Sequence, residues 1–182
     1  FSVGLRKIQT RDARFYLNDR LTFFRGTHEG CQFPLTGYPP MDMQSWRKIF
    51  TVCKAYGLNH MRFHSWCPPE AAFIAADEMG MYLQPECSNW GQYSSRDNQL
   101  VEWVNRETEK IVKAYGNHPS FVLFSTGNEP AGPWQEPLLK WCREWKAKDN
   151  RRVYASQTGR YFGERPGPVA DIDYLIAIRI GS

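Results

Sequence analysis

The chain has 182 residues, of which 42% are hydrophobic and 15% aromatic, and this composition suffices for one sizeable buried core. Its net charge of +4 comes from 23 basic and 19 acidic residues spread along the sequence, whereas a nucleic-acid-binding protein usually gathers its basic residues on one face, so we expect no nucleic-acid partner. Five widely spaced cysteines without a CxxC pair predict neither a disulfide framework nor a zinc site, and the absence of an apolar run near the roughly 20 residues of a membrane span argues against a membrane partner.

The N-terminal part of the sequence alternates apolar and polar residues in short runs, a pattern typical of strands. We predict a hairpin within residues 1–19 and interpret it as a lead-in from an upstream domain, because the sequence starts without a signal-peptide core. A turn at Asn18-Asp19 leads into residues 20–26, predicted as the first buried strand of a main domain that covers residues 20–182. The predicted hairpin strands are residues 3–8 and 14–18, joined by a polar turn at residues 9–13.

Helices and strands alternate along the rest of the chain. Asp42 can cap a helix whose apolar residues recur at helical spacing until Gly57. A second helix follows a pair of prolines and ends at Gly80, and a third ends at Gly116. The predicted helices are residues 43–56, 70–79, 98–115 and 138–147, and the predicted strands are residues 58–63, 81–86, 121–125 and 152–157.

The predicted strands are short and apolar without alternation, as expected for a parallel sheet that is covered on both faces, so the fold class is α/β. A doubly wound sheet and a (β/α)8 TIM barrel both fit this pattern. The barrel explains more, because polar residues follow each strand and barrel active sites are built where the strands end. No GxGxxG follows the first strand, which argues against a dinucleotide-binding fold. The polar residues at strand ends are His28, Glu29, Arg62, His64, Glu86, Asn128 and Glu129.

The number of predicted strands is too small for a closed barrel. A complete barrel takes about 250 residues, whereas the fifth predicted strand ends near residue 157 and residues 171–180 can form a sixth. We therefore expect the N-terminal part of a TIM barrel, with about five to six strands. An open parallel sheet leaves unpaired edges, so the missing remainder of the barrel or another copy of the chain in a homo-oligomer should cover them.

Three segments resemble the catalytic TIM barrel of glycoside hydrolase family 2, the family of β-galactosidases, β-glucuronidases and β-mannosidases. They are "FFRGTHEG", "GLNHMRFHSWCPPEAAFIAADEMGMYLQPE" and "YGNHPSFVLFSTGNE". The resemblance covers most of residues 1–130 and fades after residue 157. It implies a retaining β-glycosidase that acts on a terminal sugar of a glycan or oligosaccharide, with no cofactor and no metal. It also implies upstream β-sandwich domains and fits a periplasmic or secreted parent protein.

The last of these segments carries the catalytic prediction. A glycosidase must hold a carboxylic acid rigidly to protonate the leaving oxygen, and the end of a buried strand provides that rigidity. By resemblance, Glu129 is the general acid/base and Asn128 hydrogen-bonds the 2-hydroxyl of the sugar. Gly127 allows the backbone to turn before this pair. A glutamate that is merely solvated in a loop is the alternative interpretation.

The retaining mechanism also needs a nucleophilic carboxylate about 5–5.5 Å from the acid. In the family it comes from the seventh strand, which we expect beyond Ser182, so the chain alone is expected to be inactive. Glu164, in "FGERPGP", is predicted to be a solvated loop residue. Arg62 corresponds to the family arginine beside the nucleophile, with an internal salt bridge to Glu86 or Glu29 as the alternative.

The remaining predicted substrate-binding residues are His28, His64, Glu86 and Trp134. The motif "RFHSWCPP" places His64 one position before the family histidine, and "RGTHEG" lacks the usual Asn, so the substrate class is open. Among Trp66, Trp90 and Trp134, which all follow strands, Trp134 is the preferred sugar platform because "PAGPWQEP" is typical of a flexible loop.

Two alternative functions remain open. His28, His64, Glu86 and Glu129 at a barrel mouth can be interpreted as metal ligands of a hydrolase or isomerase, although no HxH or HExxH spacing supports this. A non-catalytic carbohydrate-binding barrel is the other alternative, and it requires that the seventh-strand glutamate be missing.

Overall fold

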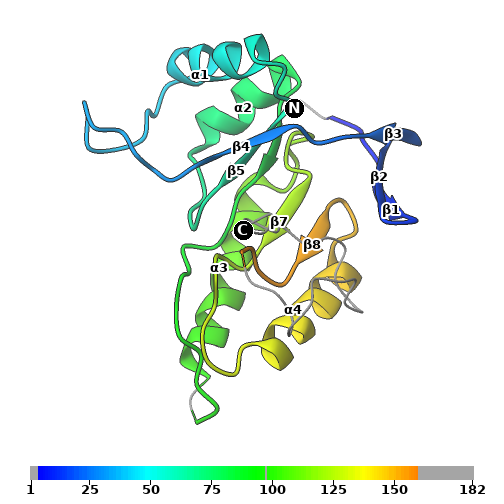
Figure 1. Cartoon of the computed structure of the whole chain (residues 1–182), viewed down its shortest axis with the longest axis vertical. Helices are drawn as coiled ribbons and strands as arrows, with labels where there is room; N and C mark the ends of the chain where they lie inside the picture. Colours follow the sequence, from blue (N-terminus) through cyan, green and yellow to red (C-terminus); the bar gives the residue numbers. More distant parts are fainter. Residues whose placement is uncertain (1–3, 97, 160–182) are drawn as a thin grey trace, which may run out of the picture.

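The N-terminal strands form a small antiparallel sheet of three strands in sequence order (Figure 1). Its strands are β1 (Ile8–Arg11), β2 (Arg14–Leu17) and β3 (Arg20–Thr22). The computed structural model describes residues 4–96 and 98–159. Both connections are two-residue turns, and their residues all have positive φ, the geometry that matches the twist of hairpin strands. The turn residues are Asp12 and Ala13 (51° and 58°) and Asn18 and Asp19 (49° and 61°).

The turn at Asn18-Asp19 and the strand predicted at residues 14–18 are confirmed. The strand predicted at residues 3–8 is misplaced, because the first turn needs two residues and not the five of residues 9–13. The sheet also continues past residue 19, since β3 pairs with β2. That this sheet originates in an upstream domain stays a prediction.

The single strand predicted at residues 20–26 is wrong, because the structure divides this segment between β3 and the first parallel strand, β4 (Gly26–Glu29). The side chain of Asn59 bonds the backbone between them, accepting from the amide of Arg25 (2.8 Å) and donating to the carbonyl of Phe23 (3.0 Å). His28 and Glu29 consequently lie within the first parallel strand and not after it.

Five parallel strands within the described residues follow one another in space in the order of the sequence (Figure 1). Parallel bridges between Leu83 and Phe121 and between Glu86 and Ser125 connect β6 to β7. This arrangement is that of consecutive strands of a (β/α)8 barrel. The sixth strand predicted at residues 171–180 lies outside the described residues. After β4, the strands are β5 (His60–Phe63), β6 (Tyr82–Gln84), β7 (Leu123–Ser125) and β8 (Val153–Ala155).

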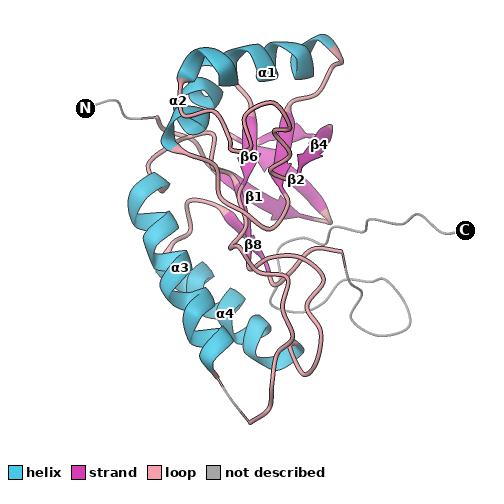
Figure 2. Ribbon diagram, turned by 90° about the vertical axis from the view of Figure 1, so that its left-hand side faces the viewer, coloured by secondary structure: helices cyan, strands magenta, loops and turns pink. Residues whose placement is uncertain are grey.

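The helices lie along one side of the parallel strands (Figure 2). Their predicted ends are largely confirmed: Asp42 accepts a 2.8 Å hydrogen bond from the amide of Ser45, and Gly80 ends its helix with φ of 67°. Among the described helices, none combines the length and the apolar character needed to cross a bilayer. The helices are α1 (Met43–Ala55), α2 (Glu70–Met79), α3 (Gln99–Tyr115) and α4 (Gln135–Lys148).

Side chains alternate between the two faces of the parallel sheet. Phe63, Leu83 and Phe124 belong to the main core, where they pack with residues of the helices such as Trp46 and Trp141. On the other face, Leu123, Val153 and Ala155 pack with Ile8 of the antiparallel sheet. This inner face becomes polar toward the strand ends, with Arg62, Gln84 and Ser125 all buried. The fold therefore directs polar side chains toward one end of the parallel strands.

Candidate active site

A buried ion pair between Arg62 and Glu86 lies at the carboxyl end of the parallel strands. Arg62 Nε donates to Glu86 Oε1 at 2.7 Å, and Nη2 donates to Oε2 at 3.2 Å. The two side chains are only 7% and 0% exposed. The same Nη2 donates to Asn128 Oδ1 at 2.8 Å. Three of the residues predicted from the sequence thus meet in one cluster, and the salt bridge of Arg62 with Glu86 is confirmed.

The Glu86 carboxylate is surrounded by donors. Besides Arg62, it accepts from the Ser65 amide (2.7 Å), the Ser125 hydroxyl (3.1 Å) and the Thr158 hydroxyl (2.9 Å). These bonds compensate for the burial of a charged pair. The alternative partner of Arg62, Glu29, instead accepts from the backbone amides of Cys31 and Gln32 at 2.9 and 3.0 Å. Glu86 therefore holds the surrounding side chains of the site in place through its hydrogen bonds.

Asn128 is held in a defined orientation. Its Oδ1 accepts from Arg62 and lies 3.3 Å from the Thr158 hydroxyl, and its backbone amide donates to the carbonyl of Asn89 at 2.9 Å. No hydrogen bond to a described residue uses Nδ2. The amide group is thus turned so that its NH2 end is the one that can donate to a ligand.

Glu129 follows in an unusual backbone conformation. Its φ is +40°, in the left-handed region that non-glycine residues rarely adopt, and its amide donates to the Thr158 carbonyl at 2.8 Å. Such conformations cluster at functional sites, where surrounding contacts hold them. The side chain is half-buried, and its carboxylate has no hydrogen bond or ion pair with any described residue. The carboxylate is therefore positioned by its backbone and remains available.

The turn before this pair requires a glycine. Gly127 has φ of +140°, and a Cβ there would lie 2.1 Å from the carbonyl oxygen of Asn89. No side chain fits into that approach. The expectation that Gly127 turns the backbone is confirmed, and its second function is to let the segment after β6 lie against the segment after β7.

The two histidines form a row of rings with Trp90. His28 is exposed and pairs in register with Arg62 on the neighbouring strand. Its ring centroid lies 6.0 Å from that of His64, which contacts Trp90 edge to face at 5.1 Å. His64 Nδ1 lies 3.3 Å from the hydroxyl of Ser65. His28, within β4, and His64, directly after β5, thus lie outside the hydrogen-bond cluster of Arg62.

Trp134 lies in the core and not in an exposed loop, so the premise of the predicted sugar platform is wrong. It is 4% exposed and packs in a cluster with Tyr93 and Leu138. The helix α4 begins at Gln135, three residues earlier than predicted, and Pro137 is tolerated in its first turn.

Two titratable groups near the cluster are uncharged at neutral pH. Burial, and then the charge of Arg62, lower the pKa of His60 to about 4, and its Nε2 has no described hydrogen-bond partner. Burial raises the pKa of the Cys87 thiol to about 12. Neither group is therefore suited to act as a charged catalyst near pH 7.

Thr158 and Ser125 were missed by sequence reasoning, although both contact Glu86. Ser125 is the last residue of β7 and was counted with the apolar strand. Thr158 follows the fifth predicted strand and bridges to Asn128 across the sheet. Position at a strand end was the available signal for both residues.

The residues proposed as metal ligands are not grouped. Within residues 4–96 and 98–159, no three His, Cys, Asp or Glu side chains are placed together as a metal site requires. Glu86 is instead bonded to Arg62. The alternative of a metal-dependent enzyme therefore receives no support from the described residues.

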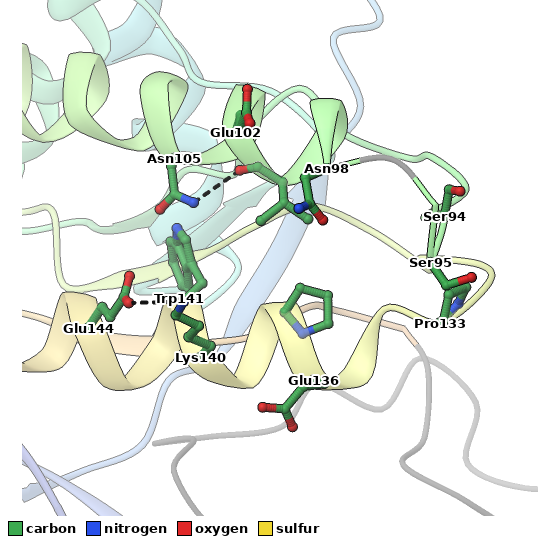
Figure 3. Close-up of a pocket in the computed structure, with 12 residues that line it drawn as sticks. Ser94, Ser95, Asn98, Glu102, Asn105, Pro133, Glu136, Lys140, Trp141 and Glu144 are labelled. Atoms are coloured by element: carbon green, nitrogen blue, oxygen red, sulfur yellow. Dashed lines mark hydrogen bonds and ion pairs between the residues drawn. The ribbon is translucent and has the colours of Figure 1, made fainter.

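A groove on the outside of the fold is separate from this site. It has a volume of about 530 Å³ and lies between α3 and α4 (Figure 3). Glu102 and Asn105 approach it from α3, and Lys140 and Glu144 from α4. None of the strand-end residues lines it.

Comparison with known proteins identifies the fold family. The family model described as "Glycosyl hydrolases family 2, TIM barrel domain" matches residues 8–163. The chain belongs to glycoside hydrolase family 2. As a partial TIM barrel of this family, it is similar to a β-galacturonidase from Eisenbergiella tayi bound to galacturonate, with a TM-score of 0.72 and 20% identity over 87% of this chain and 29% of that one. It is also similar to a β-glucuronidase from Parabacteroides merdae, with a TM-score of 0.69 and 20% identity over 84% of this chain and 20% of that one.

The curated sequence relatives are much longer than this chain. A putative β-glucuronidase of Formosa agariphila is 30% identical over 70% of this chain and 15% of its own length. A β-galactosidase of Vibrio cholerae is 26% identical over 79% of this chain and 15% of the length of that protein. A β-glucuronidase of Chlorocebus aethiops is 25% identical over 93% of this chain and 27% of the length of that protein. The chain thus spans between about one seventh and one quarter of the length of these relatives.

Proposed function

We propose that this chain forms part of the catalytic barrel of a retaining β-glycosidase, in which Glu129 is the general acid/base. The observation that carries the proposal is the presentation of Glu129 directly after the locked Asn128, with its carboxylate unengaged by described residues. A general acid must be rigid and must be able to reach the leaving oxygen. An exposed glutamate in a mobile loop would have neither a fixed backbone nor a fixed neighbour.

The described residues support distinct roles in such a reaction. Glu129 gives its proton to the glycosidic oxygen as the bond to the sugar breaks, and Asn128 donates through Nδ2 to the 2-hydroxyl. Arg62 positions Asn128 by its 2.8 Å hydrogen bond. A nucleophilic carboxylate about 5–5.5 Å away forms the glycosyl-enzyme, and Glu129 then removes a proton from the attacking water. We place this nucleophile in the full-length protein, outside the described residues.

The substrate class follows from the relatives as part of the same proposal. Their printed names are β-glucuronidase, β-galactosidase and β-galacturonidase. We therefore propose a β-linked terminal hexose or hexuronic acid. A panel of nitrophenyl β-glucuronide, β-galactoside, β-galacturonide and β-mannoside measures which sugar the full-length protein accepts.

The test of the acid/base is Glu129→Ala in the full-length protein. We expect a large loss of activity on substrates with poor leaving groups, because general acid catalysis typically contributes about 10²–10⁴-fold. Azide should restore part of the turnover of activated nitrophenyl glycosides, because it replaces water and needs no base. Glu109→Ala is the matched control, since Glu109 is an exposed glutamate on α3. An unchanged rate in Glu129→Ala would refute the assignment.

Sugar binding without any turnover of the panel by the unaltered full-length protein would instead favour the non-catalytic carbohydrate-binding barrel.

The surroundings of the barrel belong to the same proposal. We propose that residues 1–19 connect an upstream domain to the barrel, and that further strands or another copy of the chain cover the open edges of the sheet. The mass of the purified protein in solution measures whether it forms a homo-oligomer.

A further inference from the structure

Trp90 is an exposed aromatic residue between two buried residues, Asn89 and Tyr93. Trp90 is 63% exposed, whereas Asn89 is 4% and Tyr93 is 3% exposed. Asn89 Nδ2 donates to the Tyr93 hydroxyl at 2.8 Å and lies 3.3 Å from the Thr126 carbonyl. An exposed indole on a fixed backbone offers a flat apolar surface at a small cost in conformational entropy.

The backbone places Trp90 beside the proposed acid. The carbonyl of Asn89 accepts from the amide of Asn128 at 2.9 Å, and the carbonyl of Gly91 accepts from the amide of Ala131 at 3.1 Å. These two bonds flank Trp90 on one segment and Glu129 on the other. The pairing of the two segments continues with the amide of Tyr93, which donates to the carbonyl of Ala131 at 2.8 Å. Trp90 is therefore fixed next to Glu129 by the same hydrogen bonds that fix Asn128.

The exposure of the site residues increases from a buried floor to an exposed rim. The floor consists of Arg62, Glu86 and Asn128, which are all buried. Glu129 is half-buried, and Trp90 lies at the rim in contact with His64. If Glu129 protonates the bridging oxygen, the terminal sugar lies toward the floor and the leaving group lies toward the rim.

We propose that Trp90, His64 and His28 form the subsite for the leaving group, with a pyranose ring stacked on the indole of Trp90. The inference rests on the proposed glycosidase function and specifies a part of it. The apolar C–H face of a sugar fits the indole face, and the imidazoles supply hydrogen bonds to its hydroxyls. The rings of His64 and Trp90 lie in a T-shaped arrangement (interplanar angle 71°), and His28 extends the row by another ring. The full-length protein therefore acts on a saccharide chain and recognises the sugar to which the terminal sugar is linked.

The experiment compares two substrates that share the terminal sugar accepted in the nitrophenyl panel. One is a β-linked disaccharide, whose leaving sugar fills the proposed subsite. The other is the β-glycosyl fluoride, whose leaving fluoride is too small to reach it. For Trp90→Ala in the full-length protein, the ratio of kcat/KM for the disaccharide to that for the fluoride should fall at least about tenfold, since truncation of a tryptophan contact commonly costs this much. Trp90→Phe should recover most of the ratio.

Tyr56→Ala is the matched control, because Tyr56 is an aromatic residue 81% exposed at the end of α1, and its loss should leave the ratio unchanged. Equal losses on both substrates, or no loss on either, would overturn the leaving-group subsite while the glycosidase function stands. A full-length protein that cleaves neither substrate, and no glycoside of the panel, would overturn the proposed function and the subsite together.

Discussion

Replacing Arg62 by Met separates its structural from its catalytic contribution. The substitution removes the hydrogen bonds to Glu86 at 2.7 and 3.2 Å and the one to Asn128 at 2.8 Å. It leaves the Glu86 carboxylate 0% exposed and without its counter-charge. Breaking a buried ion pair by removing one partner typically costs about 3–5 kcal/mol. We expect Arg62→Met to lower the free energy of unfolding of the barrel by an amount in this range.

A second substitution tests the cause of that loss. Adding Glu86→Gln to Arg62→Met removes the uncompensated charge, and the double variant should regain about 1–3 kcal/mol, the usual coupling between contacting residues. Turnover should stay low in both variants, because Asn128 still lacks the donor that fixes its amide. Stability is measured by urea unfolding that is monitored by tryptophan fluorescence, and activity as kcat/KM on the best nitrophenyl glycoside. Both measurements use the full-length protein.

Two results would refute this reasoning. A double variant no more stable than Arg62→Met would show that the buried charge of Glu86 is not the source of the loss. Normal turnover by the folded fraction of Arg62→Met would show that the ion pair only supports the fold and that Asn128 needs no positioning.

Two further predictions concern His60 and Trp134. Because burial holds the pKa of His60 at about 4, against 6.5 for an ordinary histidine, the unfolded chain binds a proton between these values that the folded protein does not. The free energy of unfolding should therefore fall as the pH drops from 6.5 to 4, by up to about 3 kcal/mol, and urea midpoints should show a weaker fall in His60→Phe; equal slopes would contradict the assignment. Trp134→Phe should lower the melting temperature and leave KM unchanged, because the ring packs against Tyr93 and Leu138, whereas a raised KM at an unchanged melting temperature would restore its predicted role as a sugar platform.

The parallel strands could be predicted because their sequences carry a strong signal. Short apolar runs separated by amphipathic helices have few alternatives to an α/β fold, and helix ends were marked by Asp42 and Gly80. The first antiparallel strand was misplaced because its boundary depends on which two residues adopt positive φ, and Asp12 and Ala13 do not form a conspicuous turn pair. The break after β3 depends on Asn59, which is distant in sequence and therefore invisible to local patterns.

The candidate site was predictable to the extent that parallel strands end at a common edge. Arg62, Glu86 and Asn128 meet for this reason. The contribution of Thr158 was not predictable, because it depends on the spatial neighbour of Asn128 and not on its own sequence context. The position of Trp134 was misjudged because Gly132 and Pro133 suggested a long loop, whereas α4 begins directly after the tryptophan.

The close approach at Gly127 couples two loops that other barrels can vary separately. In the segment after β6, the carbonyls of Asn89 and Gly91 accept hydrogen bonds from amides of the segment after β7, and Gly127 leaves no space between the two segments. A loop graft that replaced only one of these segments would lose the matching half of the backbone pairing and would shift Glu129 with it. Variants with a new choice of leaving group are therefore accessible by exchanging both loops as one cassette, or by changing only the outward side chain at position 90.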